Sequence, residues 1–67
     1  MWSITEKHYT NEDGISYTGY GVAFGECRIE DITPSLSAIT RFVEELNRYE
    51  ASQVHIGELV ENFLAEI

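Results

Sequence analysis

The chain has 67 residues, which suffice for one small domain. Hydrophobic residues make up 43% of the chain, a share that favours a folded domain over a disordered segment. Twelve acidic residues against four basic ones give a net charge of −8. This charge repels phosphate backbones and anionic lipids, so we expect no direct contact with nucleic acid or membrane. The composition therefore predicts one small acidic domain over residues 1–67.

Cysteine content and segment patterns exclude further classes. The single cysteine, Cys27, has no partner for an intrachain disulfide, and His8 and His55 are too few to complete a cysteine-rich zinc site. No apolar run reaches the ~20 residues that span a bilayer. The first residues lack the basic and apolar regions of a signal peptide. We therefore expect a cytoplasmic protein without a cofactor, and a second copy of the chain as the source of additional burial.

The first half of the chain is rich in β-branched and aromatic residues, which favour strands. We predict strands over residues 2–9 and 15–24. Asp13-Gly14 is a strong turn signal and predicts that these strands form an antiparallel hairpin. A third strand is predicted over residues 26–32.

Small residues alternate along the second predicted strand, where Gly19, Gly21 and Ala23 share one side. This stripe predicts a face on which a helix or another backbone comes close. On the third predicted strand, Cys27 and Ile29 point inward. We interpret Cys27 as a core residue rather than a nucleophile, because no activating base lies near it in the sequence.

The second half of the chain predicts two helices. Thr33 is a suitable N-cap for the first, Pro34 a suitable first residue, and Asn47 a suitable end. Ser52 is the expected N-cap of the second helix. Gly57, inside that helix, costs ~1 kcal/mol relative to alanine, which a packed neighbour would justify. Apolar residues recur at helical spacing: Leu36, Ile39, Phe42, Val43 and Leu46, then Ile56, Leu59, Val60, Phe63, Leu64 and Ile67.

These elements predict an α+β fold of two layers. The expected order is ββ(β)αα, an antiparallel β-hairpin plus a third strand, followed by two C-terminal helices packed on one face of the sheet. Each layer has one apolar side, so the sheet and the helix pair can cover each other.

The predicted helices also carry most of the candidate functional residues. An acidic helical face can mimic the phosphate spacing of a nucleic acid, although such faces more often only contact solvent. His55 and Glu58 lie three residues apart and could bind a metal together with a second copy, but two ligands do not close a site. We assign no catalytic, cofactor-binding or metal residues. The candidate interaction face consists of Glu44, Glu45, His55, Glu58, Glu61 and Glu66.

Several short segments, spread over most of the chain, carry a resemblance to a known family. They are Tyr20-Gly21-Val22, Asp31-Ile32-Thr33-Pro34, Leu46-Asn47, Val54-His55-Ile56, Leu59-Val60 and Phe63-Leu64. In these segments the chain resembles a family of short Firmicutes proteins, mostly clostridial, that form a domain of unknown function. The resemblance implies a bacterial cytoplasmic protein and suggests no activity.

Three functions remain open. The first is a non-enzymatic protein-interaction or regulatory module that associates with itself. The second is an acidic inhibitor that mimics nucleic-acid charge toward a basic enzyme. The third is a metal-dependent site across a dimer. We rank them in this order, because so short a chain can hardly enclose an enzyme pocket of ~300–1,000 Å³ alone.

Overall fold

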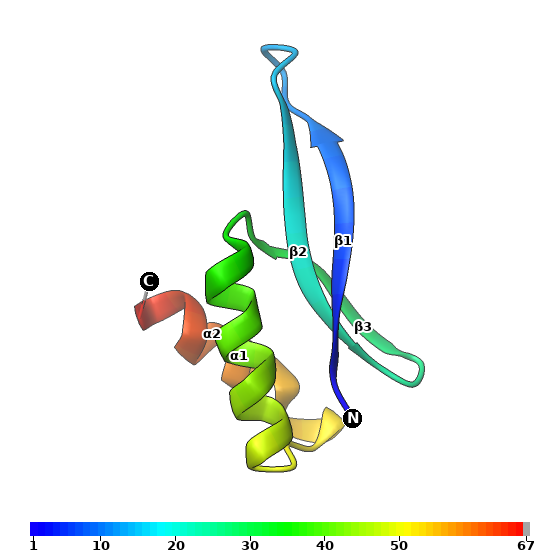
Figure 1. The fold of residues 1–67 in the computed structure, drawn as a ribbon, viewed down its shortest axis with the longest axis vertical. Coiled ribbons are helices and arrows are strands. Elements are labelled where there is room, and N and C mark those ends of the chain that lie inside the picture. The colour runs from blue at the N-terminus through cyan, green and yellow to red at the C-terminus, as the bar shows by residue number, and fades with distance from the viewer. Residues whose placement is uncertain (67) are drawn as a thin grey trace.

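The computed structural model describes residues 1–66, and Ile67 lies outside the described residues. Its strands are β1 (Ser3–Thr10), β2 (Ser16–Phe24) and β3 (Cys27–Thr33). They form one antiparallel sheet in the order β1-β2-β3 (Figure 1). The helices that follow are α1 (Leu36–Arg48), the 3₁₀ turn η1 (Gln53–His55) and α2 (Ile56–Glu66). The predicted α+β order is therefore confirmed.

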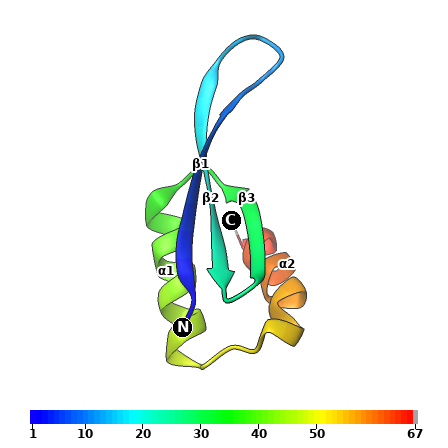
Figure 2. The ribbon, with the colours of Figure 1, turned by 90° about the vertical axis from the view of Figure 1, so that its right-hand side faces the viewer.

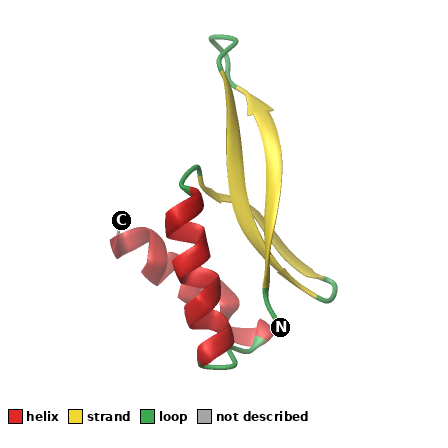
Figure 3. Ribbon diagram, in the orientation of Figure 1, coloured by secondary structure: helices red, strands yellow, loops and turns green. Residues whose placement is uncertain are grey.

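Both helices lie on the same side of the sheet, as Figure 1 shows, and Figure 2 views the molecule from the sheet. Helix α1 contacts all three strands, whereas α2 packs against α1 through stacked rings of Phe42 and Phe63, whose centroids are 4.5 Å apart. The far end of the β1–β2 hairpin projects beyond the helices (Figures 1 and 3). The buried apolar core comprises Trp2, Val22, Ile32, Ile39, Phe42, Val43, Leu46, Ile56 and Phe63. Cys27 is half-buried and packs against this core.

The hairpin turn depends on Asn11 as well as on the predicted Asp13-Gly14 signal. The Asn11 side-chain oxygen accepts hydrogen bonds from the backbone N–H groups of Asp13 and Ile15, at 2.9 and 3.0 Å. Gly14 has a φ of 78°, which glycine adopts without a Cβ clash. An asparagine that bonds its own following backbone is a common turn former, so the local sequence closes this hairpin without help from the core.

The predicted start and end of the first helix are wrong by a few residues. The N-cap is Ser35, whose hydroxyl accepts from the Ala38 N–H at 3.2 Å, and not Thr33. Thr33 is the last residue of strand β3, and its hydroxyl accepts from the Ser35 N–H at 3.2 Å, before the helix begins. Asn47 lies inside α1, which continues to Arg48.

Ser52 does act as a cap, but of η1 rather than of α2. Its hydroxyl accepts from the Val54 N–H at 3.1 Å. The chain then passes directly from η1 into α2 at Ile56. The helix therefore begins later than the cap position alone predicts, because one tighter turn precedes it.

Within the small-residue stripe of β2, Gly21 meets another backbone, which is that of β3, whereas Gly19 meets side chains. Tyr20 pairs with Thr33 and Val22 with Ile29, so Gly21 alone faces the three β3 residues between Ile29 and Thr33. A Cβ on Gly21 would contact the Ile29 carbonyl oxygen and lie 2.8 Å from the Glu30 Cα. The bulge therefore requires glycine at this position.

Gly57 has no such reason. A Cβ added there would have no neighbour within 4 Å, so the expected packed neighbour is absent from the described residues.

Alanine substitutions at these two glycines should act in opposite directions. Gly21→Ala should lower the free energy of unfolding by about 1–3 kcal/mol, because the methyl group clashes with β3. Gly57→Ala should raise it by about 0.5–1 kcal/mol, because alanine loses less backbone entropy in a helix. Urea unfolding of both variants measures the difference, and equal stabilities would refute this account of the bulge.

Candidate functional site

All six residues of the candidate interaction face are exposed, but they lie on three elements. Glu44 and Glu45 belong to α1, His55 to η1, and the other three glutamates to α2. The structure brings Glu45 and Glu66 to one hollow of about 280 Å³ between the helices, which Arg41 also lines. The positively charged side chain of Arg41 thus shares this hollow with the two glutamates.

Among residues 1–66, no three histidine, cysteine, aspartate or glutamate side chains gather into a metal-binding group. Within these residues, the structure therefore adds no third ligand beside His55 and Glu58. None of the helices in the same range is long and apolar enough to cross a membrane.

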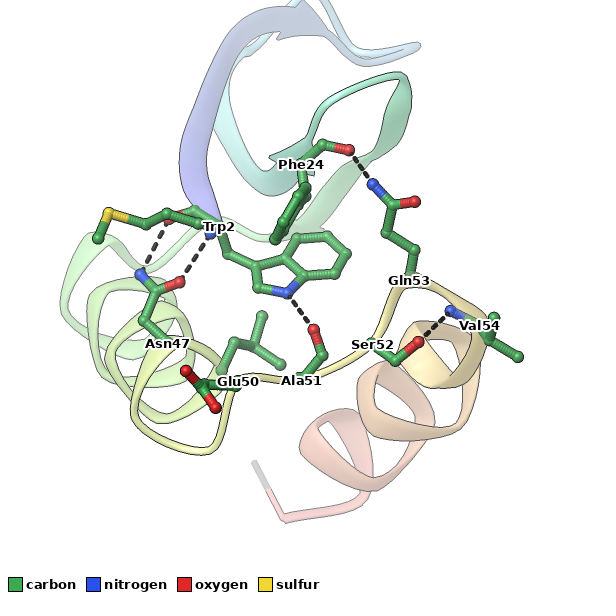
Figure 4. A pocket seen from close by; sticks show the side chains of 10 residues that line it. Trp2, Phe24, Asn47, Glu50, Ala51, Ser52, Gln53 and Val54 are labelled. Atoms are coloured by element: carbon green, nitrogen blue, oxygen red, sulfur yellow. Dashed lines mark hydrogen bonds between the residues drawn. The ribbon is translucent and has the colours of Figure 1, made fainter.

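A larger hollow lies at the end of the molecule where β1 begins and α1 ends (Figure 4). Its volume is about 590 Å³, within the range of ligand sites, which the sequence did not predict for so short a chain. We call it the Trp2 pocket. It is lined by Met1, Trp2, Phe24, Leu46, Asn47, Glu50, Ala51, Ser52, Gln53 and Val54.

Trp2 is held in the wall of this pocket by three hydrogen bonds. Its backbone N–H donates to the Asn47 side-chain oxygen at 2.7 Å, and the Asn47 amide donates back to the Trp2 carbonyl at 3.0 Å. The indole Nε1–H donates to the Ala51 carbonyl at 2.9 Å. The indole also meets the Phe24 ring edge to face, at a centroid distance of 5.4 Å (Figure 4). Only 2% of Trp2 is exposed.

The opposite wall of the pocket follows the connection from α1 to η1. The Gln53 side-chain amide donates to the Phe24 carbonyl at 2.6 Å, which ties this connection to the end of β2. Met1 and Val54 are large apolar residues of the pocket, yet they are 88% and 85% exposed. The pocket therefore combines a fixed aromatic wall with an apolar rim in water.

Helix α1 ends beside the pocket in a Schellman motif. The Ala51 N–H donates to the Leu46 carbonyl at 2.9 Å, and the Glu50 N–H donates to the Asn47 carbonyl at 3.3 Å. Glu50 has a φ of +50° and occupies the position after the helix end that is usually glycine. A residue with a Cβ atom is strained in this left-handed backbone conformation. Glu50 is nevertheless the only ionisable side chain of residues 1–66 that lines the pocket.

The sheet face opposite the helices carries a second group of side chains. Tyr9 and Tyr17 stack with their centroids 5.4 Å apart, and the Lys7 ammonium lies 5.7 Å from the Tyr9 ring centre. A Cβ on Gly19 would lie 2.8 Å from the Tyr9 ring and 2.5 Å from the Asp31 carboxylate. Glycine at this position therefore makes room for both side chains.

The pKa values of both tyrosines are raised. Loss of hydration is the largest cause, and the negative charge of Asp31 is the second, because it disfavours a nearby phenolate. For Tyr17, a hydrogen bond with Asp31 also contributes. The neutral phenols are thus favoured in the folded state. Their contribution to stability is present below the ordinary tyrosine pKa near 10 and lost as the pH rises through the raised values.

The two edges of the sheet differ. All eight residues of β1 pair with β2 in one continuous register, from Ser3 opposite Ala23 to Thr10 opposite Ser16. Strand β3 forms the other edge, and its pairing is interrupted by the bulge, where Asp31 has a φ of +54°. Within residues 1–66, β1 is therefore the only strand that presents a regular edge.

Comparison with known protein families, characterised proteins and solved structures finds no match for this chain. The resemblance to the Firmicutes family stays a prediction.

The sequence analysis missed Trp2, Asn47 and Glu50 as members of one site. Trp2 and Asn47 are 45 residues apart, and periodicity within single elements does not report a contact over that distance. A buried tryptophan whose N–H needs an acceptor was the one available signal.

Asn47→Ala should lower the free energy of unfolding by about 1–3 kcal/mol, because two half-buried backbone groups of Trp2 lose their partner. The sole tryptophan is the fluorescent reporter for denaturant unfolding. Asn62→Ala, on the exposed side of α2, is the matched control and should stay within about 0.5 kcal/mol of the unmodified chain. If both variants unfold alike, the Asn47 contacts contribute nothing.

Asp31→Asn should lower the pKa values of Tyr9 and Tyr17 toward the ordinary value, because the neighbouring negative charge is removed. Tyrosinate absorption during an alkaline titration measures this shift. A background with Tyr20→Phe and Tyr49→Phe leaves only the two stacked rings to titrate.

Glu12→Gln, in the exposed hairpin turn, is the control for this titration and should leave the curve in place. A curve that Asp31→Asn does not move would show that the aspartate does not act on the rings.

Proposed function

We propose that this chain is a non-enzymatic protein-interaction module that pairs with a second copy of itself along the free edge of β1. The contrast between the two sheet edges carries this proposal. An unpaired edge offers a row of N–H and C=O groups that another strand can pair with. The regular pairing of β1 over Ser3–Thr10 fits such an addition, whereas the bulge in β3 interrupts the ladder.

Antiparallel pairing of two β1 strands gives a continuous sheet of both copies. A two-fold axis perpendicular to the sheet keeps the helices of both copies on the same side. The acidic residues of α1 and α2 would then lie on one side of a double-width sheet. The dimer would thus present two copies of the candidate interaction face to a protein partner. Each copy of this face consists of Glu44, Glu45, His55, Glu58, Glu61 and Glu66.

The proposed dimer is reversible and sensitive to salt. An eight-residue strand is about 26 Å long, so its edge alone buries little beside the ~800 Å² per partner of a stable interface. Two copies that each carry a charge of −8 repel each other, and salt screens this repulsion. The single thiol of Cys27 fits the reducing cytoplasm that we propose as the location.

Light scattering over a range of protein concentrations, at low and high salt, tests the self-association. We expect the mass to rise with concentration toward twice the 7.6 kDa of one chain, and to rise further in high salt. A mass of one chain under every condition would refute the proposal.

Proline substitutions at Glu6 and Lys7 locate the interface. Successive residues of a strand point their N–H groups to opposite edges, so one proline breaks a bond to β2 while the other removes a donor from the free edge. The variant that keeps its melting temperature should be monomeric at concentrations where the unmodified chain is dimeric. Glu12→Pro, in the hairpin turn, is the control and should remain dimeric. A dimer that persists with both strand prolines would place the interface elsewhere.

A further inference from the structure

We propose that the Trp2 pocket binds a basic segment of a partner protein, which inserts an aliphatic or aromatic side chain beside Trp2 and directs a lysine or arginine toward Glu50. The inference rests on the proposed role as an interaction module. It uses a surface other than the β1 edge, so the two proposals can fail separately.

The apolar character of the pocket selects the inserted group. Met1 and Val54 are almost fully exposed, so a side chain seated between the rim and the aromatic wall would remove apolar surface from water. The volume of about 590 Å³ accommodates one large side chain and its neighbours.

The indole N–H and the two side-chain amide groups of the pocket wall are already paired. The indole N–H of Trp2 is bonded to Ala51, and the amides of Asn47 and Gln53 are bonded to backbone carbonyls. A hydrogen-bonding ligand would have to break these bonds, whereas an apolar side chain leaves them intact.

Glu50 supplies the charge preference. It is the only ionisable side chain of residues 1–66 in the pocket lining, and Figure 4 shows its carboxylate on the same side of the pocket as Asn47. A cationic side chain of the bound segment would pair with this carboxylate.

The charge of the whole chain selects the class of partner. A net charge of −8 attracts a cationic segment over a distance of about one Debye length and repels an acidic one. A second copy of this chain is itself strongly acidic, which disfavours it as the occupant.

Nuclear magnetic resonance of the full chain tests this proposal with three blocked peptides. All three share a central leucine–phenylalanine pair, and their flanks are lysines, glutamines or glutamates. The indole N–H of Trp2, the sole tryptophan, reports occupancy together with the amides of Ala51 and Gln53. We expect the lysine peptide to bind most tightly, the glutamate peptide most weakly, and the difference to shrink in high salt.

Variants of Glu50 separate its charge from its conformation. Glu50→Gln should weaken binding of the lysine peptide by about three-fold, the effect of one ion pair at about 6 Å in water. Glu50→Gly should weaken it equally without lowering the melting temperature, because glycine is preferred at this helix end. Glu61→Gln, an exposed glutamate of α2 outside the pocket, is the matched control and should leave the affinity unchanged.

Three results would overturn the inference. Equal binding of the three peptides would remove the charge preference, and unchanged Trp2 signals at millimolar peptide would remove the site. A Trp2 signal that moves on dilution without any peptide, in the proline variant that cannot pair through β1, would identify a second copy as the occupant. The monomeric proline variant of β1 should still bind the lysine peptide, so loss of the dimer and loss of this site are distinguishable.

Discussion

The attachment of Trp2 to the end of α1 is the contact on which the rest of the structure depends. It connects the first strand with the helix layer through Asn47 and Ala51, which are 45 and 49 residues away along the chain. Helix α1 contacts all three strands, and the stacked rings of Phe42 and Phe63 join α2 to α1. The same hydrogen bonds that fix the indole also shape the wall of the Trp2 pocket. Stability and the candidate binding surface therefore share one set of residues.

The bulge in β3 has an equally wide influence. It brings the β3 backbone over Gly21 and places the Asp31 carboxylate beside the stacked tyrosines. It also makes β3 irregular, which leaves β1 as the only regular edge among the described strands. One local irregularity thus determines both the electrostatics of the open sheet face and the side on which the sheet can grow.

Much of the fold could be predicted from the sequence because its signals are local. Helical spacing placed Ile39 in the core, and the small-residue stripe predicted a close backbone at Gly21. The N-cap of α1 was harder to predict, because Thr33 and Ser35 are both suitable cap residues and flank Pro34. The Trp2 pocket was harder to predict, because Trp2 contacts residues that are 45 and 49 positions away along the chain. Glu50 gave no signal at all, since nothing in its neighbourhood marks a left-handed residue that is not glycine.

The contact between Trp2 and Ala51 also sets an order of events during synthesis. At ~5–20 residues per second, a ribosome makes Ala51 roughly 2–10 seconds after Trp2. During that interval the hairpin of β1 and β2 can already pair, because its turn is closed by its own residues. The indole, however, has no acceptor until the end of α1 has been made. The indole N–H therefore lacks its native partner for most of the synthesis of the domain, and the domain closes only when Trp2 meets the residues that follow α1.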